Sequence, residues 1–403
     1  MDKKYDRIST LNTAISTFHN HKSISATSLR KSSEISLKLN RHVNYTSMKN
    51  SSNEKNPENQ QNKKDLLING DIDIINQTTS ENDIHCVCYT ETFDYIAAGL
   101  SNGIIKMMNV NNGNFEFALH DNEMVHNSDF TTAIKHRRVQ TNRPLTQTLT
   151  ATYANGCVKC WHYPTGRCIY KIRENREILN LFYHPLLTKF VTVGDNAISN
   201  LYDEETKTLE RIFCTSSSSS SGKIRGHKSR VYGGCFHPKS YHEFITGGWD
   251  ETIQFWDSRQ AHATRQIIVG RICGDSLDIS TNGKEILVCC GSKENAIQLW
   301  DYGSGKCIVT IEPDTWNSCL NVGKYIGKLF IACGGGDENI FRIVDLRFHS
   351  TAGFIKNLSG AVNGIDIGPN LKLTKQRISI SNTLHLPKIA FCCGKTLFEI
   401  KIH

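Results

Sequence analysis

The chain has 403 residues, of which 38% are hydrophobic and 9% aromatic, so it can bury a sizeable core. Of its formal net charge of +8, seven charges belong to residues 1–64, which hold twelve Lys/Arg and five Asp/Glu. The remainder is nearly neutral, which argues against a folded body that binds nucleic acid through its charge.

Residues 1–64 are rich in Ser, Asn, Lys and Thr and poor in aromatic residues. Such a composition cannot bury enough apolar surface to offset chain entropy, so it predicts a disordered basic tail. RNA association through this tail is one hypothesis for function, and binding would then weaken steeply with salt. Residues 65–403 are predicted to fold.

The chain opens without a continuous apolar run, which predicts that it carries no secretory signal. No stretch reaches the roughly eighteen apolar residues that cross a bilayer. The fifteen cysteines lie in apolar, strand-like runs. We therefore expect buried, reduced thiols in an intracellular protein, cytoplasmic or nuclear.

From residue 84 onward, one pattern recurs with a period of about 46 residues. Segments that alternate apolar and polar residues, as half-buried strands do, are "IIKMMN" (104–109), "VKCWH" (158–162), "ISNLYD" (198–203), "TIQFWD" (252–257), "AIQLWD" (296–301), "IFRIVD" (340–345) and "LFEIKI" (397–402). Each follows an apolar run that ends in small residues, such as "FITGG" (244–248), and other strand-like runs flank the pair.

Four strands in each of seven units predict an all-β fold, a seven-bladed β-propeller of four-stranded antiparallel blades. The predicted blades are 84–119, 129–173, 176–213, 226–269, 271–312, 315–358 and 360–403.

The unit "GHKSRVYGGCFHP…EFITGGWDETIQFWD" (226–257) resembles a WD40 repeat, with Gly-His at its head and Trp-Asp at its tail. The resemblance implies a hydrogen-bonded structural tetrad of His227, Thr246, Asp250 and Trp256 within this blade. Short polar residues mostly stand at the Asp250 position of the other units: Asn102, Asn155, Asn196, Glu294, Glu338 and Lys395. The resemblance also implies that the last blade takes its outer strand from the N-terminal side, where residues 65–76 are the candidate closing strand.

Asp250 and Asp257 could be paired carboxylates for acid–base chemistry. Residues like Asp257 recur at the strand ends of other units, whereas a catalytic residue would not repeat in every blade. We therefore interpret both as structural and predict a protein with no catalytic residues, cofactor or metal.

Cys157 and Cys160 form a CxxC pair, but residues three apart on a strand point to opposite faces, which disfavours zinc. The Gly-rich "ACGGGDEN" (332–339) sits at a strand turn, where a phosphate cradle is not expected. The basic run "KHRRVQTNR" (135–143) could add to the basic tail in binding RNA or an acidic partner, but a solvated strand end explains it better.

The WD40 resemblance points to contacts on the rim around the central channel, just before the turn Asp and at the start of each innermost strand. The predicted partner-binding residues there are Trp249, Arg230, Tyr232, Arg271, Trp316 and Asp337. Exposed Trp, Tyr and Arg dominate binding hot spots. Trp249 follows Gly247 and Gly248 in a turn, where an indole is not expected to be core.

Trp256-Asp257-Ser258-Arg259 resembles the WDxR box by which some WD40 proteins dock onto the propeller adaptor of cullin-RING ubiquitin ligases. Arg259 would be the contact, because a guanidinium offers bidentate hydrogen bonds. The leading hypothesis is thus a non-catalytic protein-interaction scaffold that holds peptide segments. A ligase substrate receptor is the alternative within binding proteins, and a tail-dependent RNA-associated factor is the alternative of another class.

Overall fold

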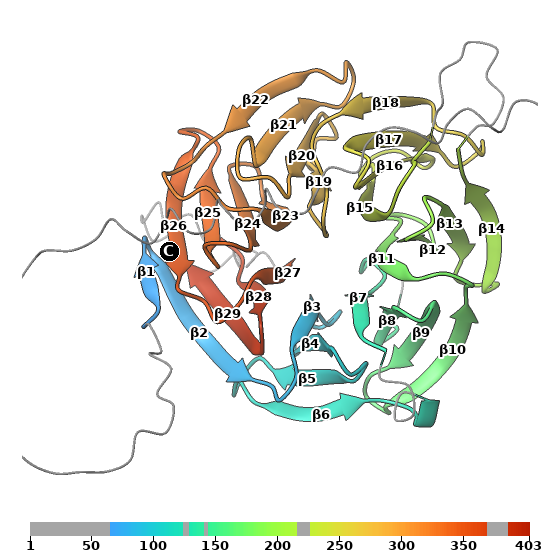
Figure 1. Cartoon of the computed structure of the whole chain (residues 1–403). Coiled ribbons are helices and arrows are strands. Elements are labelled where there is room, and N and C mark those ends of the chain that lie inside the picture. Colours follow the sequence, from blue (N-terminus) through green and yellow to red (C-terminus); the bar gives the residue numbers. More distant parts are fainter. Residues whose placement is uncertain (1–64, 124–128, 141–143, 216–225, 369–385) are drawn as a thin grey trace, which may run out of the picture. The chain divides into compact units, whose positions relative to one another are not determined.

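The computed structural model describes residues 65–123, 129–140, 144–215, 226–368 and 386–403, all within one compact unit. The predicted tail, 1–64, lies outside the described residues. The described chain forms antiparallel sheets arranged as a ring around a central axis, as Figure 1 shows. The fold class is confirmed: this is a seven-bladed propeller of four-stranded blades. Within the described part, no helix is long and apolar enough to cross a membrane.

The first three blades are continuous in sequence. Blade 1 contains β3 (Ile84–Tyr89), β4 (Tyr95–Leu100), β5 (Ile105–Asn109) and β6 (Phe115–Leu119). Blade 2 contains β7 (Thr131–Lys135), β8 (Thr148–Tyr153), β9 (Cys157–His162) and β10 (Arg167–Arg173). Blade 3 contains β11 (Ile178–Tyr183), β12 (Lys189–Gly194), β13 (Ser199–Asp203) and β14 (Thr208–Phe213).

The next three blades repeat this order. Blade 4 contains β15 (Val231–Phe236), β16 (Glu243–Gly248), β17 (Thr252–Asp257) and β18 (Arg265–Ile268). Blade 5 contains β19 (Leu277–Ile279), β20 (Glu285–Cys289), β21 (Ile297–Asp301) and β22 (Cys307–Ile311). Blade 6 contains β23 (Leu320–Ile326), β24 (Phe330–Gly335), β25 (Phe341–Asp345) and β26 (Ser350–Lys356).

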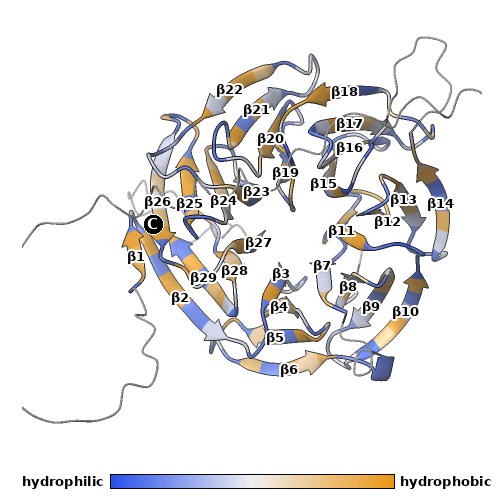
Figure 2. Cartoon of the chain, in the orientation of Figure 1, coloured by the Kyte–Doolittle hydropathy of each residue, from blue (hydrophilic) through white to orange (hydrophobic). Residues whose placement is uncertain are grey.

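Blade 7 joins the two ends of the described chain. It contains β27 (Val362–Ile367), β28 (Ile389–Cys393) and β29 (Thr396–Ile402), and its outer strand is β2 (Ile72–Thr79). The ladder between β2 and β29 runs from Ile72 opposite Ile402 to Thr79 opposite Thr396. Side chains of β2 alternate between less and more exposed positions along the strand. In Figure 2 the strand is apolar at its start and polar towards its end.

The candidate closing strand, 65–76, divides between two blades. Its first part is β1 (Leu67–Asn69), which adds a fifth strand to blade 6 by pairing with β26, and only its second part belongs to β2. Gly70 separates them with a φ of 84°, and a Cβ there would lie 2.4 Å from the Ala352 carbonyl oxygen. Only glycine accommodates this tight turn, so the chain passes from blade 6 to blade 7 at Gly70.

The hydrophobic core lies between neighbouring blades. Phe341 of blade 6 stacks on Phe391 of blade 7 with centroids 4.3 Å apart, and Phe391 stacks on Phe398 at 4.8 Å. Each buried phenyl group contributes about 1.5–3 kcal/mol by leaving water. Every blade packs on two others, so we expect the ring to be stable only when it is closed.

The innermost strands share an irregularity that positions the candidate site. In six blades the pairing of the first and second strands skips one residue near its start, a β-bulge. The bulge residues are His85, Thr132, Leu179, Tyr232, Asn321 and Asn363. A bulge redirects a side chain, and here all six line one cavity at the channel mouth.

Blade 5 departs from this pattern. The run "ICGDSLDI" (272–279) has the composition of a strand, but β19 begins only at Leu277. The amide of Ser276 donates to the Gly274 carbonyl at 2.9 Å, which makes a tight turn ahead of the strand. This turn presents Asp275 to the channel where other blades present a bulge residue.

Candidate functional site at the channel mouth

The channel mouth holds a cavity of about 250 Å³ that receives residues from all seven blades. Its walls are the bulge residues, and Gly274 and Asp275 of blade 5 complete them. A site built from every blade depends on closure of the ring, so no single repeat could form it.

Trp249 stands on the rim beside this cavity, in the turn between β16 and β17. The indole stacks on Tyr232 with centroids 5.5 Å apart and an interplanar angle of 27°, and the Arg230 guanidinium lies 5.6 Å from the indole ring. Arg230 also faces Glu177 of blade 3 at 3.8 Å. Trp249 nevertheless remains 44% exposed. The structure thus brings together three of the six predicted rim residues as a preorganised aromatic platform.

A second aromatic pair faces the same cavity from blades 1 and 2. His85 and Phe130 lie with ring centroids 5.2 Å apart, and Phe130 is 39% exposed. Burial lowers the pKa of His85 against the opposing charge of Asp83, which favours the neutral imidazole. Neither residue was predicted as a site residue. His85 could have been identified, because it occupies the same position in blade 1 as Tyr232 does in blade 4.

The floor of the cavity is ionic. Asp275 accepts hydrogen bonds from the Lys135 ammonium at 2.8 Å and from the Lys324 ammonium at 2.9 Å. Lys135 is the last residue of β7 in blade 2, and Lys324 belongs to β23 in blade 6. The ions therefore connect blades 2, 5 and 6 across the channel. Burial alone would raise the pKa of Asp275, but the two ammonium charges hold it well below its usual range.

The other three predicted rim residues do not join Trp249. Trp316 packs on Phe354 of the outer strand β26 at 4.6 Å, and the Lys356 ammonium lies 4.8 Å from its ring. The innermost strand of blade 6 begins at residue 320, so Trp316 precedes it and is displaced towards the blade edge. Asp337 faces Lys293 at 3.8 Å, and Arg271 is exposed ahead of β19.

The predicted structural residues of blade 4 form one hydrogen-bonded chain. The Trp256 indole donates to the Thr246 hydroxyl at 2.7 Å, and that hydroxyl lies 2.8 Å from Nε2 of His227. Nδ1 of His227 lies 3.0 Å from the Asp250 carboxylate. In a neutral imidazole this order puts the proton on Nδ1, so each donor faces an acceptor. Asp250 is thereby occupied in holding the blade.

Other blades replace this chain with different polar pairs. The residue opposite Thr246 on β17 is Gln254, and the register places Lys159, Asn200 and Arg342 at the same position in blades 2, 3 and 6. In blade 3, Glu174 accepts hydrogen bonds from Thr192 at 2.6 Å and Tyr202 at 3.0 Å. In blade 6, Arg342 binds Asp314 at 2.9 Å.

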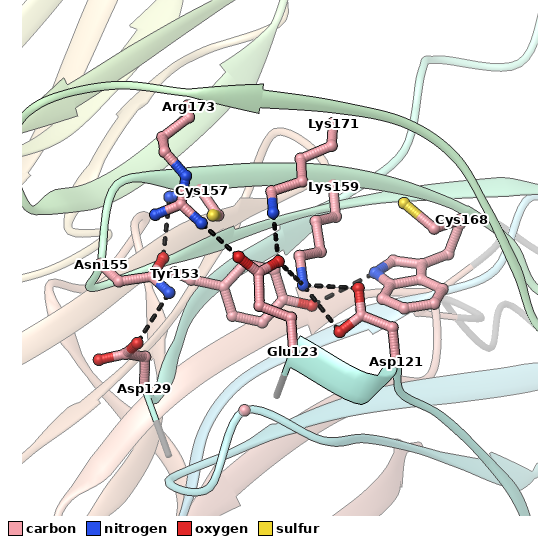
Figure 3. A network of polar contacts seen from close by, with 12 residues as sticks. Asp121, Glu123, Asp129, Tyr153, Asn155, Cys157, Lys159, Cys168, Lys171 and Arg173 are labelled. Carbon is pink, nitrogen blue, oxygen red and sulfur yellow. Dashed lines mark hydrogen bonds and ion pairs between the residues drawn. The ribbon is translucent and has the colours of Figure 1, made fainter. Parts of the chain in front are cut away.

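The blade 2 replacement appears in Figure 3, where Lys159, Lys171 and Arg173 converge on Glu123. The Lys159 ammonium binds Asp121 at 2.7 Å, and its side chain is only 2% exposed. The Lys159 and Lys171 cations lower the pKa of Glu123 to about 2, with the Lys171 hydrogen bond as the largest cause. The sequence analysis did not predict these buried charges. The available signal was Lys159, a charged residue within an apolar strand.

Arg259 lies at the opposite end of β17 from Trp249. Its guanidinium forms a bidentate pair with Asp257, at 2.9 and 2.6 Å, and its side chain is 69% exposed. Arg347 pairs with Asp345 in the same geometry in blade 6. Trp249 and Arg259 therefore belong to opposite faces of the propeller.

All fifteen cysteines are free thiols. Burial raises the pKa of Cys160 to about 11, which keeps that thiol protonated and poorly suited to metal binding. Among the residues that the structure describes, no group of three or more His, Cys, Asp or Glu side chains could hold a metal ion.

Similarity to known proteins agrees with this geometry. Residues 218–257, which include most of blade 4 and its hydrogen-bonded chain, match the family "WD domain, G-beta repeat". This segment is a WD40 repeat. The chain is 29% identical to WD repeat-containing protein 70 of Xenopus tropicalis over 127 residues, or 29% of this chain and 20% of the relative. It is 24% identical to Gastrulation defective protein 1 homolog of Drosophila melanogaster over 135 residues, or 32% of this chain and 20% of the relative.

These matches span about a fifth of the length of the curated relatives. The WD40 propeller is a fold typical of protein-interaction scaffolds, and it is generally non-catalytic.

Proposed function

We propose that this protein is a non-catalytic interaction scaffold that binds peptide segments of other proteins at the channel mouth. The observation that carries the proposal is Trp249, an indole that is 44% exposed while Tyr232 and Arg230 hold it in place. A rigid, exposed aromatic group loses little conformational entropy on binding, which suits a hot spot. An intracellular location, cytoplasmic or nuclear, remains part of the proposal.

The cavity beside Trp249 supports peptides rather than flat protein surfaces as partners. It is concave, about 250 Å³, and walled by His85, Phe130 and Tyr232 together with amide side chains. A side chain of an extended segment fits such a space, while its neighbours can lie on the exposed rim.

The test is selection of a displayed library of random peptides on the immobilised full-length chain. We expect the enriched peptides to lose at least tenfold in affinity on Trp249→Ala, as for an aromatic hot spot. Tyr241→Ala is the matched control, because Tyr241 is 56% exposed at the other end of blade 4. Peptides that bind both variants equally well would contradict the proposed surface.

A second candidate function is a substrate receptor of a cullin-RING ubiquitin ligase. The exposed Arg259 guanidinium supports it, since its Asp257 partner sets its orientation while leaving the side chain 69% exposed. Arg259→Ala should abolish binding of the purified propeller adaptor, whereas Arg347→Ala should not. Equal binding by wild type and Arg259→Ala would refute this role. The tail-dependent RNA hypothesis falls on residues outside those described.

A further inference from the structure

A cavity of about 520 Å³ opens between blades 1 and 2, with aromatic walls formed by Tyr95, Phe117 and Tyr163. It lies at the turn between the third and fourth strands of blade 2. That turn is at the end of the blades that carries Arg259, opposite Trp249. We propose that this inter-blade cavity binds an arginine side chain from an extended segment of another protein. The site is separate from the channel mouth and goes beyond the proposed function.

The equivalent place between blades 4 and 5 is filled by an arginine of the chain itself. The Arg265 guanidinium lies 3.7 Å from the ring centroid of Phe255 and 5.4 Å from that of Tyr302. It also donates to the carbonyl oxygen of Tyr302 and, at 3.0 Å, to that of Gly303. A guanidinium is therefore a group that this fold accommodates between an outer strand and the turn of the next blade.

Blade 1 supplies a phenyl group where blade 4 supplies the guanidinium. Phe117 on β6 lies opposite Met107, and Arg265 on β18 lies opposite Phe255. Met107 and Phe255 correspond, because each lies two residues before the end of its third strand. Phe117 packs edge-on against Tyr95, with ring centroids 5.2 Å apart. Among the described residues, none that lines the inter-blade cavity is a cation.

The turns beside the two places also correspond. Tyr163 and Tyr302 each follow the third strand of their blade, and each amide donates to the residue before the second strand, at 3.2 and 2.7 Å. Three residues later, Gly166 and Gly305 both have a φ of 66°. A Cβ at Gly305 would lie 3.3 Å from Nη1 of Arg265, whereas no described atom lies within 4 Å of one at Gly166. The space that Arg265 fills is thus open in blade 2.

Carboxylates make the inter-blade cavity suited to a cation. Asp94 is exposed and lines it, and Glu116 accepts the hydroxyl of the wall residue Tyr95 at 3.0 Å. Hydrogen bonds from Asn112, Tyr95 and Asn109 lower the pKa of Glu116, so its carboxylate is held ionised by neutral donors. Within the described part of the chain, no cation forms an ion pair with Asp94 or Glu116.

The other charged groups nearby do not reverse this preference. Glu91 adds a third carboxylate behind the wall, where it accepts hydrogen bonds from the neutral groups of Thr146 and Gln147 at 2.6–2.8 Å. Lys106 lies over Phe115, on the other face of the blade from Phe117. A guanidinium can stack on an aromatic ring and pair with a carboxylate at the same time, which favours arginine over lysine.

The test selects a displayed library of random peptides on the immobilised full-length chain, with the Phe117→Arg protein in solution as competitor. Phe117→Arg gives blade 1 the side chain that blade 4 has at Arg265, so we expect it to fill the inter-blade cavity from within. Peptides retained on the wild-type protein should share an arginine. Replacing it with citrulline, which keeps the shape and removes the charge, should weaken binding about tenfold or more.

Two variants and a matched control locate the peptides. Asp94→Asn should weaken the arginine peptides about threefold to fivefold, as for an exposed charge pair. Glu205→Gln is the matched control, because it removes an exposed carboxylate from the turn between β13 and β14 of blade 3. Glu205→Gln and Trp249→Ala should each change the affinity by less than about twofold, because both residues are distant from the inter-blade cavity.

The outcomes separate this proposal from the channel-mouth function. Retained peptides without an arginine, an exchange to citrulline without effect, or an empty selection overturns the arginine site. So does binding that is lost on Trp249→Ala and kept on Asp94→Asn, which would support the channel mouth instead. If Phe117→Arg does not fold, the citrulline exchange and Asp94→Asn decide with peptides selected on the wild-type protein alone.

Discussion

Thr246 is central to the polar contacts within the fourth blade. Its single hydroxyl accepts a hydrogen bond from the Trp256 indole and faces Nε2 of His227. All three side chains are almost completely buried. A buried polar group without a partner costs about 1–3 kcal/mol, so one missing hydroxyl leaves two ring nitrogens unsatisfied.

We therefore expect Thr246→Val to lower the free energy of unfolding by about 3 kcal/mol, measured by urea denaturation. Thr208→Val, on the exposed outer strand β14, should change it by less than about 0.5 kcal/mol. A Thr246→Val protein as stable as wild type would show that the hydrogen-bonded chain does not hold the blade together.

Single-residue roles were partly accessible from sequence. The exposure of Trp249 follows from two glycines before a polar turn, a local feature that a sequence reader can interpret. The position of Trp316 does not follow from the sequence, because the start of β23 at residue 320 depends on how blade 6 pairs with its neighbours. Its contact with Phe354 is a tertiary one.

Among the elements, the third strands show how degenerate repeats keep one architecture. Lys159 and Arg342 occupy the position of Gln254 and form buried ion pairs in blades without a Thr at the Thr246 position. The WD40 sequence pattern is lost in blades 2 and 6. A polar contact between the third strand and the loop that precedes the blade is nevertheless retained. A buried charge that is paired is tolerated, whereas an unpaired one is not.

This predicts unequal effects for two lysines of blade 2 that both face Glu123. Lys159→Ala should destabilise the protein by about 3 kcal/mol, because its ammonium is buried against acids. Lys171→Ala should cost at most about 1 kcal/mol, because Lys171 is 36% exposed. Thermal melting of both variants measures this difference. Equal shifts in melting temperature would argue against a structural role for the buried pair.

At the scale of the whole molecule, ring closure depends on β2, which supplies the outer strand of the seventh blade. A chain that starts at residue 65 keeps every strand of the described propeller and should melt cooperatively at the wild-type temperature. A chain that starts at residue 81 lacks β2 and exposes the edge of β29, so it should be aggregated or lack a cooperative transition. A soluble, cooperatively melting 81–403 would refute closure by β2.

The ionic connection across the channel predicts an acid-dependent stability. The pKa of Asp275 is well below its usual range in the folded protein, against about 3.9 in the unfolded chain. Its contribution is therefore complete above about pH 4 and is lost as the pH falls through the folded value. Between about pH 4 and 2, Asp275→Asn should show a shallower loss of unfolding free energy than wild type, by up to about 1.4 kcal/mol per pH unit. Parallel curves would contradict this.

The sequence by itself determined the fold class, because alternation within strands and a repeat length close to a propeller blade are local properties of the chain. It also predicted the hydrogen-bonded residues of blade 4. It predicted that Trp249, Tyr232 and Arg230 lie on the rim, and their binding of a partner stays a prediction. Only the tertiary structure decided that Lys135 reaches Asp275 over 140 positions of sequence, and that bulge residues of six blades meet at one cavity. The physical reason is that a propeller forms its site where the blades converge. The sequence of one repeat does not specify which residues of the other blades face that repeat across the channel.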